Sequence, residues 1–156
     1  MPQAKRKTTT RHAPAEPAIN HIDPSQLPDV YGMRVAGDCM APEIPDGSLL
    51  HFDKREPVKA GDTVIIYARP ELVRPGGMQA QVKRLVLAIP DCVKFPFRQH
   101  PDSNVSPLII AEMLNPPRQL MINCSDVLAV HKCMGPLSED QVTGKIPAPK
   151  LRRVRR

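Results

Sequence analysis

The chain has 156 residues, of which 41% are hydrophobic and 24% are charged, and these values are typical of one globular domain with short extensions. No apolar run is long enough to cross a bilayer, and the basic first ten residues are not followed by the apolar segment of a secretion signal. We therefore expect a cytoplasmic protein with no membrane partner.

The net charge of +6 is carried by the two ends of the chain. Residues 1–12 contain four basic and no acidic side chains, residues 141–156 contain six basic and no acidic ones, and residues 13–140 contain 12 basic and 16 acidic ones. Such ends either bind nucleic acid or another acidic partner, or only keep the protein in solution. With no Trp, two Tyr and three Phe, a row of aromatic side chains for stacking single-stranded bases is excluded.

Nineteen prolines are spread along the chain and exclude long helices. Residues 1–28 contain five prolines and no apolar period, which predicts a flexible basic arm. Residues 29–137 form short β-type runs between turn residues, and residues 138–156 form a basic tail rich in Pro and Arg. This pattern predicts a mostly β domain whose strands lie within residues 31–36, 48–53, 63–68, 78–89, 107–113, 120–123 and 127–133.

The four cysteines, Cys39, Cys92, Cys124 and Cys133, form no C-x-x-C pair and have no histidine at zinc-finger spacing. His131 lies near two of them, but this segment has the pattern of a strand, in which a cysteine usually fills apolar space. We expect no metal site and no cofactor.

The surroundings of Cys39 are unusual. A predicted strand runs into Gly37, whose backbone permits a sharp turn, and Pro42 and Pro45 stiffen the exit from that turn. A turn of this kind is a common position for a nucleophile. The alternative is a thiol buried in a loop.

Lys83 lies within the predicted strand at residues 78–89. Strand alternation places it on the same side as the apolar Leu85, Leu87 and Ile89. A lysine on such a face either extends outward at a sheet edge or lies where loss of water favours the neutral amine, which acts as a general base. Only a partner distinguishes these alternatives.

Six segments follow one another at characteristic spacing: GDCMAP at 37–42, PDGSLL at 45–50, GDTVII at 61–66, VKRL at 82–85, LNP at 114–116 and DVLAV at 126–130. With these segments the chain, from about residue 33 to 134, resembles the LexA-like Ser-Lys peptidases. That family includes the self-cleaving domains of LexA and phage repressors and the polymerase-accessory protein UmuD.

The resemblance implies a mostly β, LexA- and signal-peptidase-like β-ribbon domain. It places Cys39 in the nucleophile position, Lys83 in the general-base position, and the backbone amides of Asp38 and Cys39 in the oxyanion hole. It also implies a role in the SOS response, a recombinase filament as activator, and a homodimer formed through the C-terminal strands, for which residues 127–130 offer an apolar surface.

The chain departs from the family in two respects. Cys39 stands where the family has serine, and a thiol gives up its proton more readily than a hydroxyl but is larger. Residues 1–32 contain neither the Ala-Gly nor the Cys-Gly dipeptide at which family members cut themselves. The first hypothesis is a Cys-Lys peptidase that cuts an unrecognised bond in its own arm or in another chain. The second is a non-catalytic dimerisation or binding module that uses the basic ends. A soluble relative of the signal peptidases is a third option.

Overall fold

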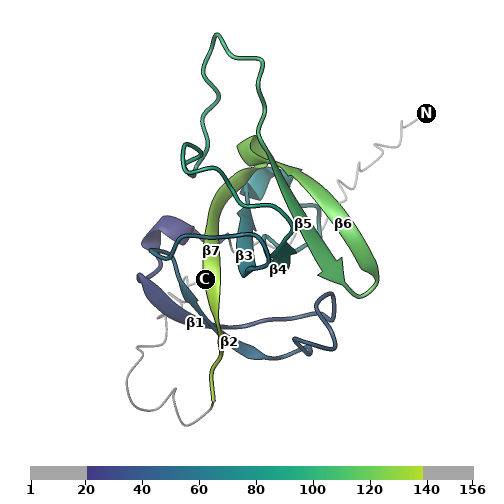
Figure 1. Ribbon diagram of the computed structural model, residues 1–156. Coiled ribbons are helices and arrows are strands. Elements are labelled where there is room, and N and C mark those ends of the chain that lie inside the picture. The colour runs from purple at the N-terminus through teal and green to yellow at the C-terminus, as the bar shows by residue number, and fades with distance from the viewer. Residues whose placement is uncertain (1–20, 139–156) are drawn as a thin grey trace, which may run out of the picture.

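The structure is a computed structural model that describes residues 21–138 as a predominantly β domain (Figure 1). Its strands are β1 (Val30–Arg34), β2 (Leu49–Asp53), β3 (Thr63–Ala68), β4 (Ala80–Leu85), β5 (Leu108–Leu114), β6 (Pro117–Asn123) and β7 (Val127–Pro136). Three short 3-10 helices complete the elements of this region: η1 (Pro24–Gln26), η2 (Pro70–Leu72) and η3 (Cys124–Asp126). The predicted mostly β fold class is confirmed.

Every run that was expected to form a strand overlaps one, although β1, β5, β6 and β7 each extend beyond the expected bounds. The run at 63–68 coincides with β3, whereas the run at 78–89 is reduced to Ala80–Leu85. The apolar pattern continues beyond Leu85, but Leu87 is 60% exposed and lies outside the sheet. None of the helices within residues 21–138 is long and apolar enough to span a membrane.

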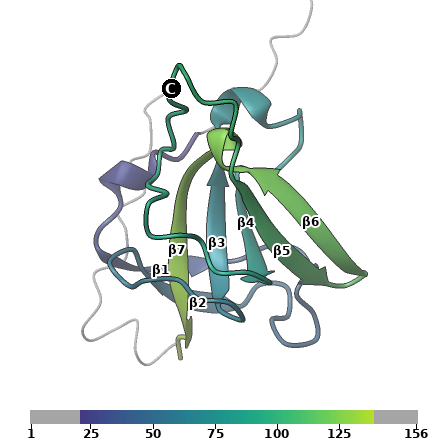
Figure 2. The ribbon, with the colours of Figure 1, turned by 45° about the horizontal axis from the view of Figure 1, so that its top comes forward.

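The strands form one antiparallel sheet in the order β1-β2-β7-β3-β4-β5-β6. Figure 2 shows β7, β3, β4, β5 and β6 side by side in this order. The last strand in the sequence, β7, therefore lies between β2 and β3 and joins the N-terminal hairpin to the rest of the sheet.

Two apolar clusters pack against the sheet, and β3 contributes to both. Val64 and Ile66 belong to the first cluster, whereas Ile65 and Tyr67 belong to the second. This division follows from the alternation of side chains along a strand. Because both sides of β3 are buried, the strand reads in the sequence as a continuous apolar run.

The apolar run at 127–130, on which the expected dimer depends, is partly covered within the domain, with Val127 buried and the next three residues half-buried. Val127 and Val130 pack in the first cluster, and Leu128 and Ala129 pack against the second. This part of β7 also pairs with β3. The run therefore packs against both apolar clusters while keeping some exposed surface, and the homodimer formed through it stays a prediction.

Residues 21–28, which the sequence analysis assigned to the arm, contact the body of the domain. Asp23 caps η1 by accepting a hydrogen bond from the amide of Ser25. Ile22 and Leu27 pack against the second apolar cluster. The expected flexible arm at residues 1–20 and most of the basic tail, residues 139–156, lie outside the described residues.

Candidate active site

Cys39 lies in the connection between β1 and β2. Gly37 in this connection has a φ of 94°, a conformation that residues with a side chain rarely adopt. Its amide donates a hydrogen bond of 2.7 Å to the Asp46 carboxylate. The amide of Gly47 donates to the carbonyl oxygen of Val35 at 2.9 Å and closes the base of the connection. The sharp turn expected before the cysteine is therefore present.

The end of β5 anchors this turn. The carbonyl oxygen of Cys39 accepts hydrogen bonds from the amides of Leu114 at 2.8 Å and Asn115 at 3.0 Å. The side-chain amide of Asn115 also donates to the Asp38 carboxylate at 3.3 Å. The sequence pattern included Leu114 and Asn115 but assigned them no role. Because Asn115 lies 77 positions from Asp38, no local pattern reveals this contact.

Lys83 lies on β4 with 4% of its surface exposed. Its Nζ donates to Cys39 Sγ at 3.2 Å and to the carbonyl oxygen of Val82 at 3.1 Å. The ion pairs found within residues 21–138 do not include this amine. The structure thus brings together the two side chains that the resemblance paired, and the sulfur is the nearest ionisable partner of a buried amine.

Strand register explains how Lys83 reaches this position. Lys83 is opposite Val64 on β3, and Val64 shares an apolar cluster with Leu85. Side chains of directly opposite residues in an antiparallel pair point to the same face of the sheet. Lys83 therefore starts from the face of Val64 and Leu85, as strand alternation predicts. The long side chain extends from that face to the edge of β4, where Cys39 Sγ lies 3.7 Å from the carbonyl oxygen of Val82.

The pairing of β4 is asymmetric. On one side it pairs with β3 along most of its length, but on the other side only Arg84 and Leu85 pair with β5. The edge from Ala80 to Lys83 is consequently left uncovered by β5. The Cys39 turn and a groove lie along this edge.

The groove has a volume of about 660 Å³, and both Cys39 and Lys83 contribute to its wall. Gly76 and Gly77 also line part of it. Its lining is mainly apolar and comes from the second cluster, the β1–β2 connection and the β5–β6 hairpin, and includes Met33, Val35, Ile44, Ile65, Met113 and Leu120. A concave apolar surface of this size beside a nucleophile is a suitable binding site for an extended peptide.

Arg84, the residue after Lys83, connects three parts of the site. Its guanidinium forms an ion pair with Glu43 in the Cys39 turn and another with Glu112 on β5 at 3.8 Å. These groups are partly exposed, so each pair stabilises the fold by only about 0–1 kcal/mol. Their main effect is to align the turn with β4.

The predicted oxyanion hole consists of the backbone amides of Asp38 and Cys39. The carbonyl oxygen of Asp38 accepts a hydrogen bond from the amide of Ala41 at 2.9 Å, and this bond orients the peptide unit that carries the Cys39 amide. The carbonyl of Cys39 is held by β5 as described above. The turn is thus restrained on both sides of the cysteine, and the role of the two amides remains a prediction.

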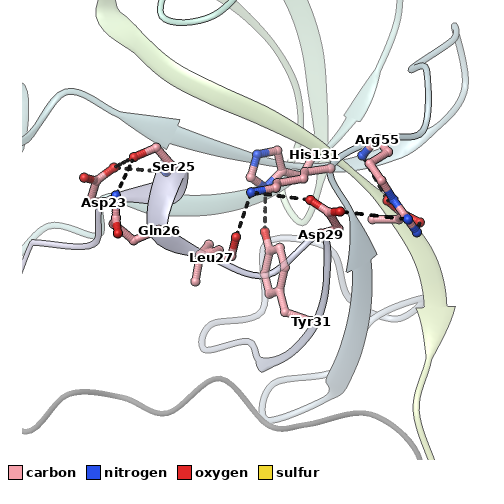
Figure 3. Close-up of polar contacts among 10 residues, drawn as sticks. Asp23, Ser25, Gln26, Leu27, Asp29, Tyr31, Arg55 and His131 are labelled. Atoms are coloured by element: carbon pink, nitrogen blue, oxygen red, sulfur yellow. Dashed lines mark hydrogen bonds and ion pairs between the residues drawn. The ribbon is translucent and has the colours of Figure 1, made fainter.

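A second buried polar cluster lies elsewhere on the sheet and was not predicted. His131 Nδ1 and the Tyr31 hydroxyl are 2.8 Å apart (Figure 3). The same hydroxyl lies 2.8 Å from that of Tyr67. Burial, with a smaller contribution from Lys54, lowers the pKa of His131 from 6.5 to about 4, and burial raises the pKa of Tyr67 to about 12. All three rings are therefore uncharged at neutral pH.

This hydrogen bonding explains why His131 does not combine with the neighbouring cysteines. Cys124 is buried in the first apolar cluster, and Cys133 packs against the second. Within residues 21–138, no three His, Cys, Asp or Glu side chains are arranged to hold a metal ion.

Comparison with known families agrees with this geometry. The chain matches the family described as Peptidase S24-like over residues 4–95, which is more than half of its length and includes Cys39 and Lys83. The chain belongs to the S24-like peptidase family. Neither the curated proteins nor the solved structures contain a significant match to it.

Proposed function

We propose that this member of the S24-like family is an endopeptidase that cleaves its own chain through Cys39 and Lys83. The observation that carries the proposal is the 3.2 Å contact between Lys83 Nζ and Cys39 Sγ in the wall of the groove. A nucleophile next to a base, both facing a space for the substrate, is the arrangement that covalent cleavage of a peptide requires.

In the proposed reaction the sulfur of Cys39 attacks the carbonyl carbon of the scissile bond, and its proton passes to the amine of Lys83 before or during the attack. The negative charge on the substrate oxygen is stabilised by the amides of Asp38 and Cys39. Lys83 returns the proton to the leaving nitrogen as the C–N bond breaks. Water then hydrolyses the thioester and regenerates the thiol.

The free edge of β4 supports the binding of an extended substrate. The carbonyl oxygen of Gln79 accepts a hydrogen bond from Ala68 next to β3, and backbone groups alternate in direction along a strand. The backbone groups of Ala80 and Val82 therefore point to the opposite side, along which the groove lies. A substrate segment can add to this edge as a short further strand beside Ala80, while the carbonyl oxygen of Val82 keeps its hydrogen bond from Lys83.

The position of Ile22 supports the N-terminal segment of the chain as the substrate. Ile22 lines the groove, its amide donates to Gln79 Oε1 at 2.7 Å, and its carbonyl oxygen accepts from Gln79 Nε2 at 2.8 Å. The N-terminal end of the described residues therefore lies at the wall of the groove. An extended stretch of twenty residues spans up to about 65 Å, which is ample for reaching the cysteine of the same or a second molecule.

Measurement of intact mass tests the proposal. The purified full-length protein is incubated at neutral and alkaline pH, and we expect a discrete fragment that lacks part of residues 1–20. Cys39→Ala and Lys83→Ala should both abolish the fragment, whereas Cys39→Ser should preserve or increase it because a hydroxyl restores the family's nucleophile. Absence of any fragment from both the native and the Cys39→Ser protein at every pH would contradict the proposal.

The alternative is a non-catalytic module of the same fold. Cysteine in place of serine and the missing Ala-Gly and Cys-Gly dipeptides in residues 1–32 favour it. In this case the domain serves as a homodimer, and its basic ends contact nucleic acid or an acidic partner. Binding of DNA that weakens steeply with salt and is lost on removal of residues 1–12 and 141–156, in a protein that never cleaves, would select this alternative.

A further inference from the structure

We propose that Cys39 and Lys83 also form a redox-sensitive site, at which a hydroperoxide converts their contact into a covalent sulfur–nitrogen bond. The inference needs only the contact and access from the groove, so it does not rest on peptide cleavage. It follows from the cysteine itself, since a serine in this position has no comparable oxidation chemistry.

The geometry of the pair favours bond formation. The Nζ and Sγ atoms are 3.2 Å apart, so the two groups need only a small movement to bond. Lys83 is 4% exposed, and the hydrogen bond to the carbonyl oxygen of Val82 at 3.1 Å keeps its amine at the edge of β4. Two amides from the end of β5 hold the backbone of Cys39. Neither partner has to be brought from a distant position.

Access for a small oxidant comes from the groove. Cys39 is half-buried and lines a space of about 660 Å³, which is much larger than a hydroperoxide molecule. Gly76 and Gly77, which line part of the groove, add no side chains that would narrow it. The sulfur is thus reachable, while the amine beside it is buried.

The chemistry balances in two steps. The Cys39 thiolate attacks the peroxide, so that an S–O bond forms and the O–O bond breaks. Sulfur is oxidised to a sulfenic acid, and the peroxide is reduced to a hydroxide that takes the ammonium proton of Lys83 and leaves as water. The neutral amine then attacks the sulfenic sulfur. An S–N bond forms, the S–O bond breaks, and hydroxide leaves as a second water with a proton from nitrogen.

The other cysteines do not combine access from the groove with a lysine amine beside the sulfur. Burial raises the pKa of the Cys124 thiol and also that of the Cys133 thiol, which makes both less reactive. Cys92 is exposed. Among residues 21–138, the hydrogen bond from a lysine amine to a cysteine sulfur is the one between Lys83 and Cys39. Oxidation of the other thiols should therefore give acids or disulfides but no lysine link.

The S–N bond would consume both the nucleophile and the amine, and a thiol reductant would restore them by breaking that bond. The consequence is a reversible block of the groove under oxidising conditions. If the protein is a peptidase, the block stops cleavage. If it is a binding module, the link still stiffens the Cys39 turn against β4.

Peptide mapping of the full-length protein tests the link. After treatment with hydrogen peroxide and digestion with trypsin, Cys39 is expected in the peptide 35–54 and a modified Lys83 in the peptide 60–84. We expect these two peptides as one species, lighter than their sum by two hydrogen atoms and separated again by dithiothreitol. Peroxide products that carry sulfenic, sulfinic or disulfide groups at Cys39 without the 35–54 to 60–84 link would overturn the proposal.

Variants sharpen the test. Lys83→Met and Lys83→Arg should abolish the link and let Cys39 proceed to the sulfinic acid, whereas Cys92→Ser should leave the yield of the link unchanged. Because the mapping is also done on the native protein, failure of a variant to fold does not decide the outcome. A link without peptide cleavage would refute the proposed function alone, and cleavage without a link would refute this inference alone.

Discussion

The sheet carries two buried polar clusters that differ in what surrounds them. In one, Lys83 is buried next to a thiol, with no carboxylate partner among the described residues, and the pair borders a large groove. In the other, the hydroxyls of Tyr31 and Tyr67 and the imidazole of His131 satisfy one another within the core. The comparison teaches that burial of an ionisable group does not define a reactive site. What distinguishes the first cluster is the thiol beside the amine and the groove that reaches both side chains.

The largest effect is expected on the reactivity of the Cys39 thiol, which belongs to the first cluster. We expect Lys83→Met to slow alkylation of Cys39 near neutral pH several-fold, because it removes the amine that donates a hydrogen bond to the attacking sulfur at 3.2 Å. Alkylation of Cys92, which is exposed, should not change. Site-resolved mass spectrometry after a short pulse of iodoacetamide measures both rates. Equal alkylation rates at Cys39 in the native protein and in Lys83→Met would show that the buried amine does not affect the thiol.

The His131 cluster should show itself through stability instead. The pKa of His131 is lowered to about 4 in the folded protein, whereas a histidine in the unfolded chain keeps its ordinary value of 6.5. The unfolded state therefore binds more protons between these values, and stability decreases as the pH falls through this window. The expected loss is about 2 to 3 kcal/mol.

Urea unfolding at pH 7.5 and pH 4.5 measures this loss. His131→Gln should unfold with a much weaker dependence on pH across the same range. A native protein whose unfolding free energy stays constant between these pH values would show that His131 is not buried in its neutral form.

A smaller effect on stability is expected when the hydroxyl of Tyr31, which contacts both Tyr67 and His131, is removed. Tyr31→Phe keeps the ring but leaves the Tyr67 hydroxyl and His131 without their common partner. We expect a loss of about 1 to 2 kcal/mol in unfolding free energy. Alkylation of Cys39 should be unaffected, since neither Tyr31 nor His131 lines its groove. If Tyr31→Phe changed the reactivity of Cys39 and left the unfolding free energy unchanged, the Tyr31 cluster would affect the thiol site and would not stabilise the fold.

The smallest effect concerns the entrance of the N-terminal segment into the groove. Gln79→Leu removes both hydrogen bonds to the backbone of Ile22 and should cost about 1 kcal/mol of stability. If the segment before Ile22 is the substrate, the rate of self-cleavage should also fall. Gln99→Leu is the matched control, because Gln99 is exposed and does not line the groove. Equal cleavage rates in the two variants would argue against an entrance held by Gln79.

The sequence by itself determined the strands and the turn at Cys39. The alternation of apolar side chains and the backbone effects of proline and glycine act over a few residues. The local sequence around Gly37 and along 63–68 is therefore enough to predict a turn and a strand. The pairing of Cys39 with Lys83 came from the resemblance to a family, because a contact across 44 positions has no local signature.

Only the tertiary structure decided which distant segments meet. The sheet order places β7 between β2 and β3, which packs the apolar run at 127–130 against both clusters and brings His131 to Tyr31 across 100 positions. The same order leaves the edge of β4 open and places Asn115 beside the Cys39 turn. These contacts depend on long-range strand pairing, which minimises the free energy of the whole sheet rather than that of any short segment.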